Sequence, residues 1–353
     1  MNQASELLAT AGSMLQELQR SPAYVPSAYW ADLNVKNARM LEAEGLENFK
    51  RTLSQNYYTW LITQPRHAMF RHAFLQWLRN PNLLPFNTRL DELTHLRLTT
   101  THDAVSLSSF ERHVYRLYVC FVWSTMLAHD RLKLHERLSE PLVGNPISVR
   151  SGNKVLTQDL ANSILECNVI ADVTSKCTRP RVAELGAGYG RLAQVFSATQ
   201  RGQYFIFDVP PALAVSQWYL QSVIGPEKVF AFRPFERLEE VAAEMERASV
   251  VFLTANQMEK FPDGFFDAIV SISTLPELSP EQVSLYLTLF QRKSGSHIFL
   301  KQWKRWKNPL DGTDLNASSY QLNDDWRICM DRTDAINSLF FNRVWERTGS
   351  KVM

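Results

Sequence analysis

Residues 181–191, RVAELGAGYGR, constrain the fold of this chain more than any other stretch. The apolar run after Pro180 predicts a buried strand, and the residues from 191 to 198 have the apolar spacing of a helix. Between them, Gly186, Gly188 and Gly190 predict a tight turn, because glycine takes positive φ and lets the backbone approach a ligand. The free N–H groups at the start of a helix attract polar ligands. This order predicts a nucleotide-type cofactor site, and the alternative is an ordinary strand–turn–helix junction.

The spacing of the glycines indicates which cofactor such a site would bind. A dinucleotide site reads G-x-G-x-x-G, whereas this chain reads E-x-G-x-G-x-G, with Glu184 two residues before the first glycine. A carboxylate there would repel a pyrophosphate and would suit the cationic amino group of S-adenosylmethionine. Glu184 therefore favours a methyltransferase over a dehydrogenase, which is the weakest of the enzyme readings.

Composition excludes some classes of partner and compartment. The 353 residues carry a net charge of +2 with no basic block, so we expect no nucleic-acid partner. The four cysteines lack metal-ligand spacing and predict free thiols in a reducing cytoplasm. The chain begins without a signal-peptide pattern, and no apolar window approaches the length of a membrane span.

Periodicity divides the chain into two expected domains. Residues 1–150 are predicted to form a helical N-terminal domain, with helices at 5–18, 40–60, 67–78 and 110–134. This domain could serve as a substrate lid, as a dimer interface, or as both. Residues 151–353 alternate strands and helices, which predicts an α/β, Rossmann-like, mostly parallel sheet. Further strands are expected at 203–207, 228–232, 249–253, 266–272 and 297–301, and helices at 157–170, 212–223, 236–247 and 279–290.

Ligands bind such sheets at the carboxyl ends of the strands, and several polar residues fall there. Asp208, about 20 residues after the glycine turn, could bind both ribose hydroxyls; alternatively it is an N-cap acid for the next helix. Asn256 and Gln257 could read an adenine edge. The candidate cofactor-binding residues are Glu184, Gly186, Ala187, Gly188, Gly190, Arg191, Asp208, Val209, Asn256, Gln257, Met258, Ser273 and Gln158.

Four segments together resemble bacterial proteins described as putative sugar O-methyltransferases. They are ELGAGYGR (184–191), IFDVPPALAVSQWYL (206–220), FLTANQMEKFPDGFFDAIVSISTLPEL (252–278) and FLKQWKRWKNPLD (299–311). The segment 141–166 is similar to the same proteins, so the resemblance covers roughly residues 140 to 310. It implies a class I methyltransferase sheet of seven strands, S-adenosylmethionine as methyl donor and a sugar hydroxyl as acceptor.

Methyl transfer to a hydroxyl is an in-line displacement that needs a general base. Glu277, after the predicted strand 266–272, is the best-placed candidate, although it could equally be a solvated loop acid. His102, beside Asp103, is the second candidate. No carboxylates pair at a strand end, so we expect chemistry without a metal ion. Two alternatives stay open: an O- or N-methyltransferase of a non-sugar natural product, and a non-catalytic partner subunit with this fold.

Overall fold

A computed structural model of the chain describes residues 3–51, 61–79, 88–90, 97–99, 104–308 and 312–349. Contacts divide the chain into two compact units. We call them the sheet unit (Met1–Asn34, Ile170–Asp334 and Leu339–Met353) and the helical unit (Val35–Val169 and Ala335–Ser338). The first helix belongs to the sheet unit, although the sequence placed it in a helical domain 1–150.

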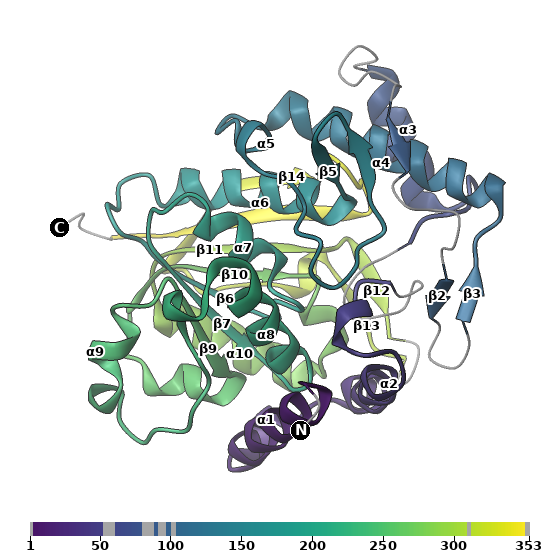
Figure 1. Cartoon of the computed structure of the whole chain (residues 1–353). Helices are drawn as coiled ribbons and strands as arrows, with labels where there is room; N and C mark the ends of the chain where they lie inside the picture. The colour runs from purple at the N-terminus through teal and green to yellow at the C-terminus, as the bar shows by residue number, and fades with distance from the viewer. Residues whose placement is uncertain are drawn as a thin grey trace. The chain divides into compact units, whose positions relative to one another are not determined.

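The sheet unit is built on eight strands, and seven of them point in the same direction (Figure 1). Their order is β14 (Trp326–Thr333), β15 (Phe340–Arg347), β11 (Ser294–Trp303), β10 (Phe266–Ile272), β6 (Arg181–Leu185), β7 (Gln203–Asp208), β9 (Val250–Thr254) and β8 (Val229–Phe230). The pairs β11–β15 and β15–β14 are antiparallel. The expected α/β class with a Rossmann-like, mostly parallel sheet is confirmed, with eight strands where about seven were expected.

Register places the ends of the central strands at one level. Leu185, which ends β6, pairs with Phe207 of β7 on one side and with Ser271 of β10 on the other. The loops that follow these three strands therefore leave the sheet side by side. This is the edge at which open α/β sheets bind ligands.

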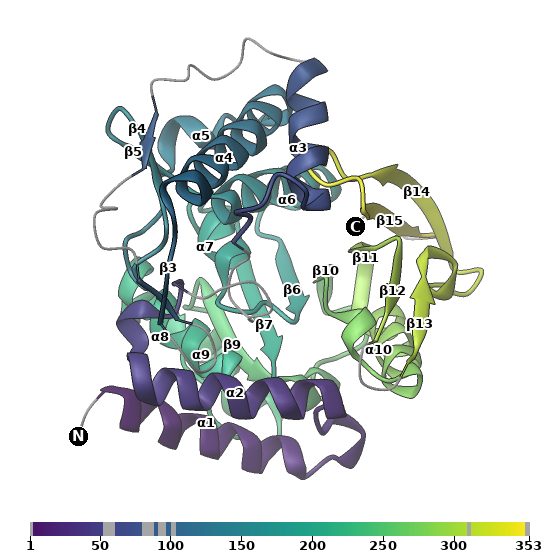
Figure 2. The ribbon, with the colours of Figure 1, turned by 90° about the vertical axis from the view of Figure 1, so that its right-hand side faces the viewer.

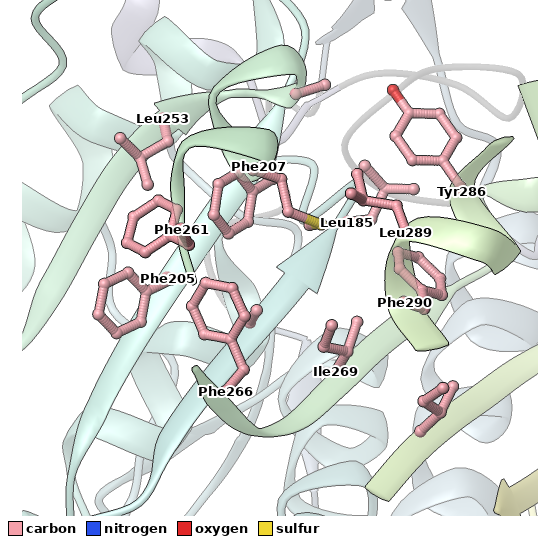
Figure 3. Packing of buried hydrophobic residues seen from close by; sticks show 14 of the residues in the cluster. Leu185, Phe205, Phe207, Leu253, Phe261, Phe266, Ile269, Tyr286, Leu289 and Phe290 are labelled. Carbon is pink, nitrogen blue, oxygen red and sulfur yellow. The ribbon is translucent and has the colours of Figure 1, made fainter. Parts of the chain in front are cut away.

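Helices cover both faces of the sheet. One face packs under α10 (Pro280–Lys293) and α9 (Ala242–Met245) through a cluster rich in phenylalanine, and Figure 3 shows Phe205, Phe207, Phe261 and Phe266 in it. The other face packs under α7 (Arg191–Ser197) and α8 (Ala212–Ile224), which contact β7. Because successive strand residues point to opposite faces, a strand covered on both sides reads as a continuous apolar run.

Helix α1 (Gln3–Gln19), the 3₁₀ turn η1 (Pro22–Tyr24) and the start of α2 (Ala28–Glu44) also belong to the sheet unit. Figure 2 shows α1 lying across the end of the sheet toward which the arrow of β7 points. Leu18 and Tyr24 are part of the same buried cluster as Phe205 and Phe207. The N-terminal segment thus packs near the carboxyl ends of the strands.

The helical unit contains the long helix α4 (Ser109–His129), which begins with a capping box of Ser108 and Glu111. Helix α3 (Ala68–Arg79) packs on it, with the rings of Trp77 and Phe121 5.2 Å apart. The other elements that lie in it or enter it are η2 (Leu46–Asn48), β1 (Arg89–Leu90), β2 (Arg97–Thr99), β3 (Ala104–Ser106), α5 (Leu134–Arg137), β4 (Val149–Ser151), β5 (Lys154–Leu156) and α6 (Gln158–Val173).

Most expected elements are confirmed, but several were wrong in extent. The helix expected over 110–134 ends at His129, and the strand expected over 228–232 is the two-residue β8. The helix expected over 40–60 ends at Glu44, before Gly45, which has φ +75°. The helix expected over 236–247 is only η5 (Leu238–Glu240) and the four-residue α9. The chain beyond β11 forms a hairpin of β12 (Arg305–Lys307) and β13 (Asp314–Asn316).

Candidate functional site

The glycine turn between β6 and α7 has the backbone that only glycine adopts at low cost. Gly186, Gly188 and Gly190 have φ of +77°, +59° and +84°. A Cβ on Gly186 would lie 2.1 Å from Oγ1 of Thr274, in the loop after β10, and that hydroxyl donates to the Gly186 carbonyl. The glycine turn and the loop after β10 are therefore packed directly against each other.

Asp208 ends β7 beside this turn and is buried. One carboxylate oxygen accepts the N–H of Gly188 at 2.9 Å, and the other accepts the N–H of Val209 at 2.7 Å. Helix α8 has Pro211 as its N-cap, so Asp208 is not the capping acid of that helix. Burial raises the pKa of Asp208 to about 7, although hydrogen bonds from the N–H groups of Val209, Gly188 and Ala187 favour its charged form.

The chain leaves β10 through Ser273, which has φ +57°. Positive φ in a serine costs free energy, and residues strained in this way cluster at functional sites. Glu277 follows four residues later in the 3₁₀ turn η7 (Leu275–Glu277) and is half-buried. Burial, and secondly the negative charge of Asp208, raise the pKa of Glu277 to about 8. Within the part of the chain that the structure describes, the Glu277 carboxylate has no hydrogen-bond or ion-pair partner.

Three other candidate side chains are bonded within the protein. Glu184 is buried and accepts the hydroxyl of Tyr204 at 2.8 Å. Asn256 donates its amide to the carbonyl of Glu17 in α1 at 3.2 Å. Gln257 accepts the N–H of Thr254 at 2.9 Å and donates to the carbonyl of Arg233, which commits its amide to the capping box of η6 (Ala255–Lys260).

The remaining candidates differ in where the structure puts them. Four of them lie in or beside the loops already described. These are Ala187 at the glycine turn, Arg191 at the start of α7, Val209 directly after Asp208 and Met258 within η6. Gln158 is the buried first residue of α6 and belongs to the helical unit. His102, the second candidate base, lies outside the described residues.

Sequence reasoning missed that the N-terminal segment reaches Glu277. The Ser27 hydroxyl donates to the backbone carbonyl of Glu277 at 2.9 Å. Two residues later, burial, and then the charges of Glu277 and Asp32, raise the pKa of Tyr29 to about 12. No motif marks these residues, and about 250 positions separate them from Glu277 in sequence, so only the fold reveals their proximity.

Neither a metal-binding cluster nor a membrane-spanning helix is found among the residues that the structure describes. No group of three or more histidine, cysteine, aspartate or glutamate side chains there could hold a metal ion. No helix in those ranges is both long enough and apolar enough to cross a membrane.

The two raised carboxyl pKa values predict that the ligand-free protein loses stability as pH rises. The folded-state pKa of Asp208, about 7, lies above its ordinary 3.8, and that of Glu277, about 8, lies above 4.5. Folding therefore favours the protonated groups, so their contribution is complete below about pH 4 and is lost as pH rises to about 8. We expect the free energy of unfolding to fall more between pH 5 and pH 8 in the wild type than in Asp208→Asn/Glu277→Gln. Urea denaturation at both pH values checks this, and parallel pH profiles would contradict it.

No protein-family model matches the chain, and no curated protein matches it by sequence. Among solved structures it is similar to a magnesium protoporphyrin IX methyltransferase from Synechocystis PCC 6803 with bound SAM, at 11% identity and a TM-score of 0.37 over 54% of this chain and 84% of that one. It is also similar to a SAM-dependent methyltransferase from Aquifex aeolicus, at 14% identity and a TM-score of 0.30 over 52% and 90%. A third is an rRNA methylase from Escherichia coli, at 14% identity and a TM-score of 0.33 over 53% and 66%. Likenesses at these TM-scores do not bear on activity, and the fold class follows from the sheet of this chain.

Proposed function

We propose that this chain is a methyltransferase that uses S-adenosylmethionine and transfers its methyl group to a hydroxyl of a sugar or a glycosylated metabolite. One observation carries the proposal. Asp208 and Glu277 are two neighbouring carboxyls on either side of the glycine turn, and in the described residues neither forms an ion pair with a lysine, arginine or histidine. Such a pair is costly in its ionised form, and a ligand with hydroxyl donors and a positive charge would stabilise that form.

S-adenosylmethionine has both features. Its ribose hydroxyls would donate to Asp208, whose backbone N–H partners from Gly188 and Val209 already orient the carboxylate. Its sulfonium is a positive charge that would lie on the side of Glu277. A dinucleotide would instead bring a pyrophosphate to a turn flanked by carboxylates, which is electrostatically unfavourable.

Glu277 fits the role of general base. The bound cofactor supplies a methyl group activated by the sulfonium. The acceptor hydroxyl oxygen forms the new bond to the methyl carbon, and Glu277 takes up the hydroxyl proton as that bond forms. A pKa near 8 makes Glu277 a stronger base than an ordinary glutamate, while part of it is ionised at neutral pH.

The glycine turn, with the loop after β10 packed against it, supports a preformed cofactor site. Thr274 holds the Gly186 carbonyl, and Ser273 keeps its N–H bonded to the Lys301 carbonyl at 2.8 Å despite its positive φ. The specificity for a sugar is supported by the resemblance of residues 184–311 to putative sugar O-methyltransferases.

The charge of the sulfonium gives a direct test. We expect the affinity ratio of S-adenosylmethionine to S-adenosylhomocysteine to rise by about tenfold between pH 6 and pH 8.5, because ionised Glu277 attracts the sulfonium but not the neutral thioether. Glu277→Gln should make the ratio independent of pH. Calorimetric titration of both ligands at each pH measures it, and a pH-dependent ratio that survives in Glu277→Gln would contradict the assignment.

A further inference from the structure

Asn256 has one half of its side-chain amide bonded and, among the described residues, no partner for the other half. Its amide nitrogen donates to the backbone carbonyl of Glu17 in α1 at 3.2 Å. Its amide oxygen is buried and accepts no hydrogen bond from any residue that the structure describes, and Asn256 as a whole is only 5% exposed. A buried acceptor without a donor is destabilising, so this oxygen fits a donor that comes from outside the chain.

The order of the strands places Asn256 where the adenine of the cofactor would lie. Asp208, which would hold the ribose, ends β7 and pairs in register with Thr254 at the end of β9. Glu277, on whose side the sulfonium would lie, follows β10, and β6 with the glycine turn stands between β10 and β7. A cofactor with these two contacts extends its adenine away from β10, toward the loop after β9. Asn256 is the second residue of that loop.

The unpartnered oxygen of Asn256 matches the amino group of adenine, which is a hydrogen-bond donor. Gln257, the neighbouring amide, already accepts from the N–H and the hydroxyl of Thr254 and donates to the carbonyl of Arg233. Hypoxanthine carries an oxygen acceptor at the position of the adenine amino group, so it would set two acceptors against each other. An amide oxygen at this position therefore selects adenine over hypoxanthine.

Helix α1 determines which half of the Asn256 amide faces the ligand. An asparagine amide that turns by 180° exchanges its donor and its acceptor. Because the Glu17 carbonyl accepts from the amide nitrogen, the amide oxygen faces away from that carbonyl. The last turn of α1 is itself anchored: the Glu17 carboxylate pairs with Lys260 of η6 at 3.3 Å, and Leu18 is fully buried in the cluster of the sheet unit. Helix α1 also contacts β9.

We propose that helix α1 is part of the cofactor site: the Glu17 carbonyl orients Asn256 so that its amide oxygen accepts the adenine amino group, and this contact selects an adenosyl over an inosyl ligand. The proposal rests on the proposed function and deepens it. Glu17 is a positioning residue, since it acts on the ligand through Asn256. Docking of α1 and binding of the cofactor stabilise each other, because each holds one half of the same amide.

The test compares two ligands that differ only in the base. The full chain is titrated by calorimetry with S-adenosylhomocysteine and with S-inosylhomocysteine, in which hypoxanthine replaces adenine. We expect the adenosyl ligand to bind at least about tenfold more tightly. Asn256→Ala should weaken binding of the adenosyl ligand and bind both ligands about equally. Equal affinities in the wild type, or a preference that survives in Asn256→Ala, would overturn the proposal.

Variants of α1 separate positioning of Asn256 from general stability. Leu18→Ala loosens the last turn and lets the Asn256 amide turn, so it should narrow the preference for the adenosyl ligand. Glu17→Gln removes the ion pair with Lys260 without opening a cavity, and it should change the preference in the same direction. Leu7→Ala is the matched control, because Leu7 is a buried leucine of the same helix about 16 Å from Leu18 along the axis. It should keep the wild-type preference, and an unchanged preference in both Leu18→Ala and Glu17→Gln would contradict the role of α1.

Hydrogen exchange measures the coupling between α1 and the cofactor independently of base selectivity. S-adenosylhomocysteine should slow exchange of the backbone amides in residues 14–19 more than in residues 3–8. Equal exchange of residues 14–19 with and without the ligand would contradict the coupling.

Failure of this proposal and failure of the proposed function give different results. No binding of S-adenosylhomocysteine to the wild type would overturn both. Binding of S-adenosylhomocysteine without a preference over S-inosylhomocysteine would overturn only the role assigned to Asn256 and α1.

Discussion

Asp208→Ala is expected to weaken binding of S-adenosylhomocysteine by about 100-fold, because two hydrogen bonds from the ribose to a charged acceptor contribute about 3 kcal/mol. Asp208 is the acid that ends β7, and it is already oriented by the N–H groups of Gly188 and Val209. Asp208→Asn keeps an oxygen acceptor without the charge, so it should lose less affinity for S-adenosylhomocysteine than Asp208→Ala. Calorimetry at pH 8, where the wild-type carboxyl is mostly ionised, measures both variants.

Asp267→Ala is the matched control for this prediction. Asp267 lies at the start of β10, at the opposite end of the parallel strands, and its carboxylate accepts the N–H of Arg181 at 2.7 Å. It therefore resembles Asp208 in bonding to backbone but not in position. The control should bind S-adenosylhomocysteine like the wild type, and equal losses in Asp208→Ala and Asp267→Ala would show that the first loss is structural.

Gly186→Ala is expected to have the second large effect, on folding as well as on binding. Gly186 has φ +77°, and the added Cβ would lie 2.1 Å from Oγ1 of Thr274. The unfavourable φ costs about 1–2 kcal/mol and the collision about 1–3 kcal/mol more. We expect a loss of about 2–5 kcal/mol in the free energy of unfolding. Binding of S-adenosylhomocysteine should become undetectable, because the glycine turn must move.

Gly264→Ala separates the effect of φ from that of the collision. Gly264 has φ +72°, but the nearest atom to its added Cβ, the Cα of Gly295, is 3.8 Å away. Chemical denaturation should show a loss of about 1–2 kcal/mol from the backbone alone, and ligand affinity should not change. Gly186→Ala could instead lower the free energy of unfolding and the ligand affinity no more than Gly264→Ala does. In that case the packing of the glycine turn on Thr274 does not determine the shape of the site.

Local signals in the sequence predicted most of the sheet unit. The strand 266–272 is β10 without change, and the Ser279 capping pattern marked the start of α10. The glycine turn and Asp208 were located because strand ends and glycine spacing follow from the chain alone. Each of these inferences uses residues within about 25 positions of one another, the range over which pattern reasoning is informative.

The same local rules also bear on Gln257 and on the segment 236–247. Thr254 and Gln257 have the spacing of a capping box, as Ser279 and Gln282 do, and the structure shows both boxes. That pattern could have identified Gln257 as a capping residue before a role in binding adenine was considered. The charged segment 236–247 has helical periodicity, but it buries only Val241 and Met245 in the cluster, with Leu238 packed against it, and it forms only η5 and the four-residue α9.

Contacts between distant residues could not be predicted. Ser27 and Glu277 are brought together because Leu18, Tyr24 and Trp30 pack on the buried cluster of the sheet unit. Periodicity shows that α1 is amphipathic but does not say which surface its apolar side covers. The contact between the N-terminal segment and Glu277 is therefore the part of the candidate site that the sequence did not predict.

Direct titration of the wild-type chain with S-adenosylmethionine and with NAD⁺ at pH 8 tests the central claim most directly. The account predicts binding of one S-adenosylmethionine per chain and no detectable binding of NAD⁺, since carboxylates beside the glycine turn favour a cation and disfavour a pyrophosphate. Binding of NAD⁺ without binding of S-adenosylmethionine would contradict it.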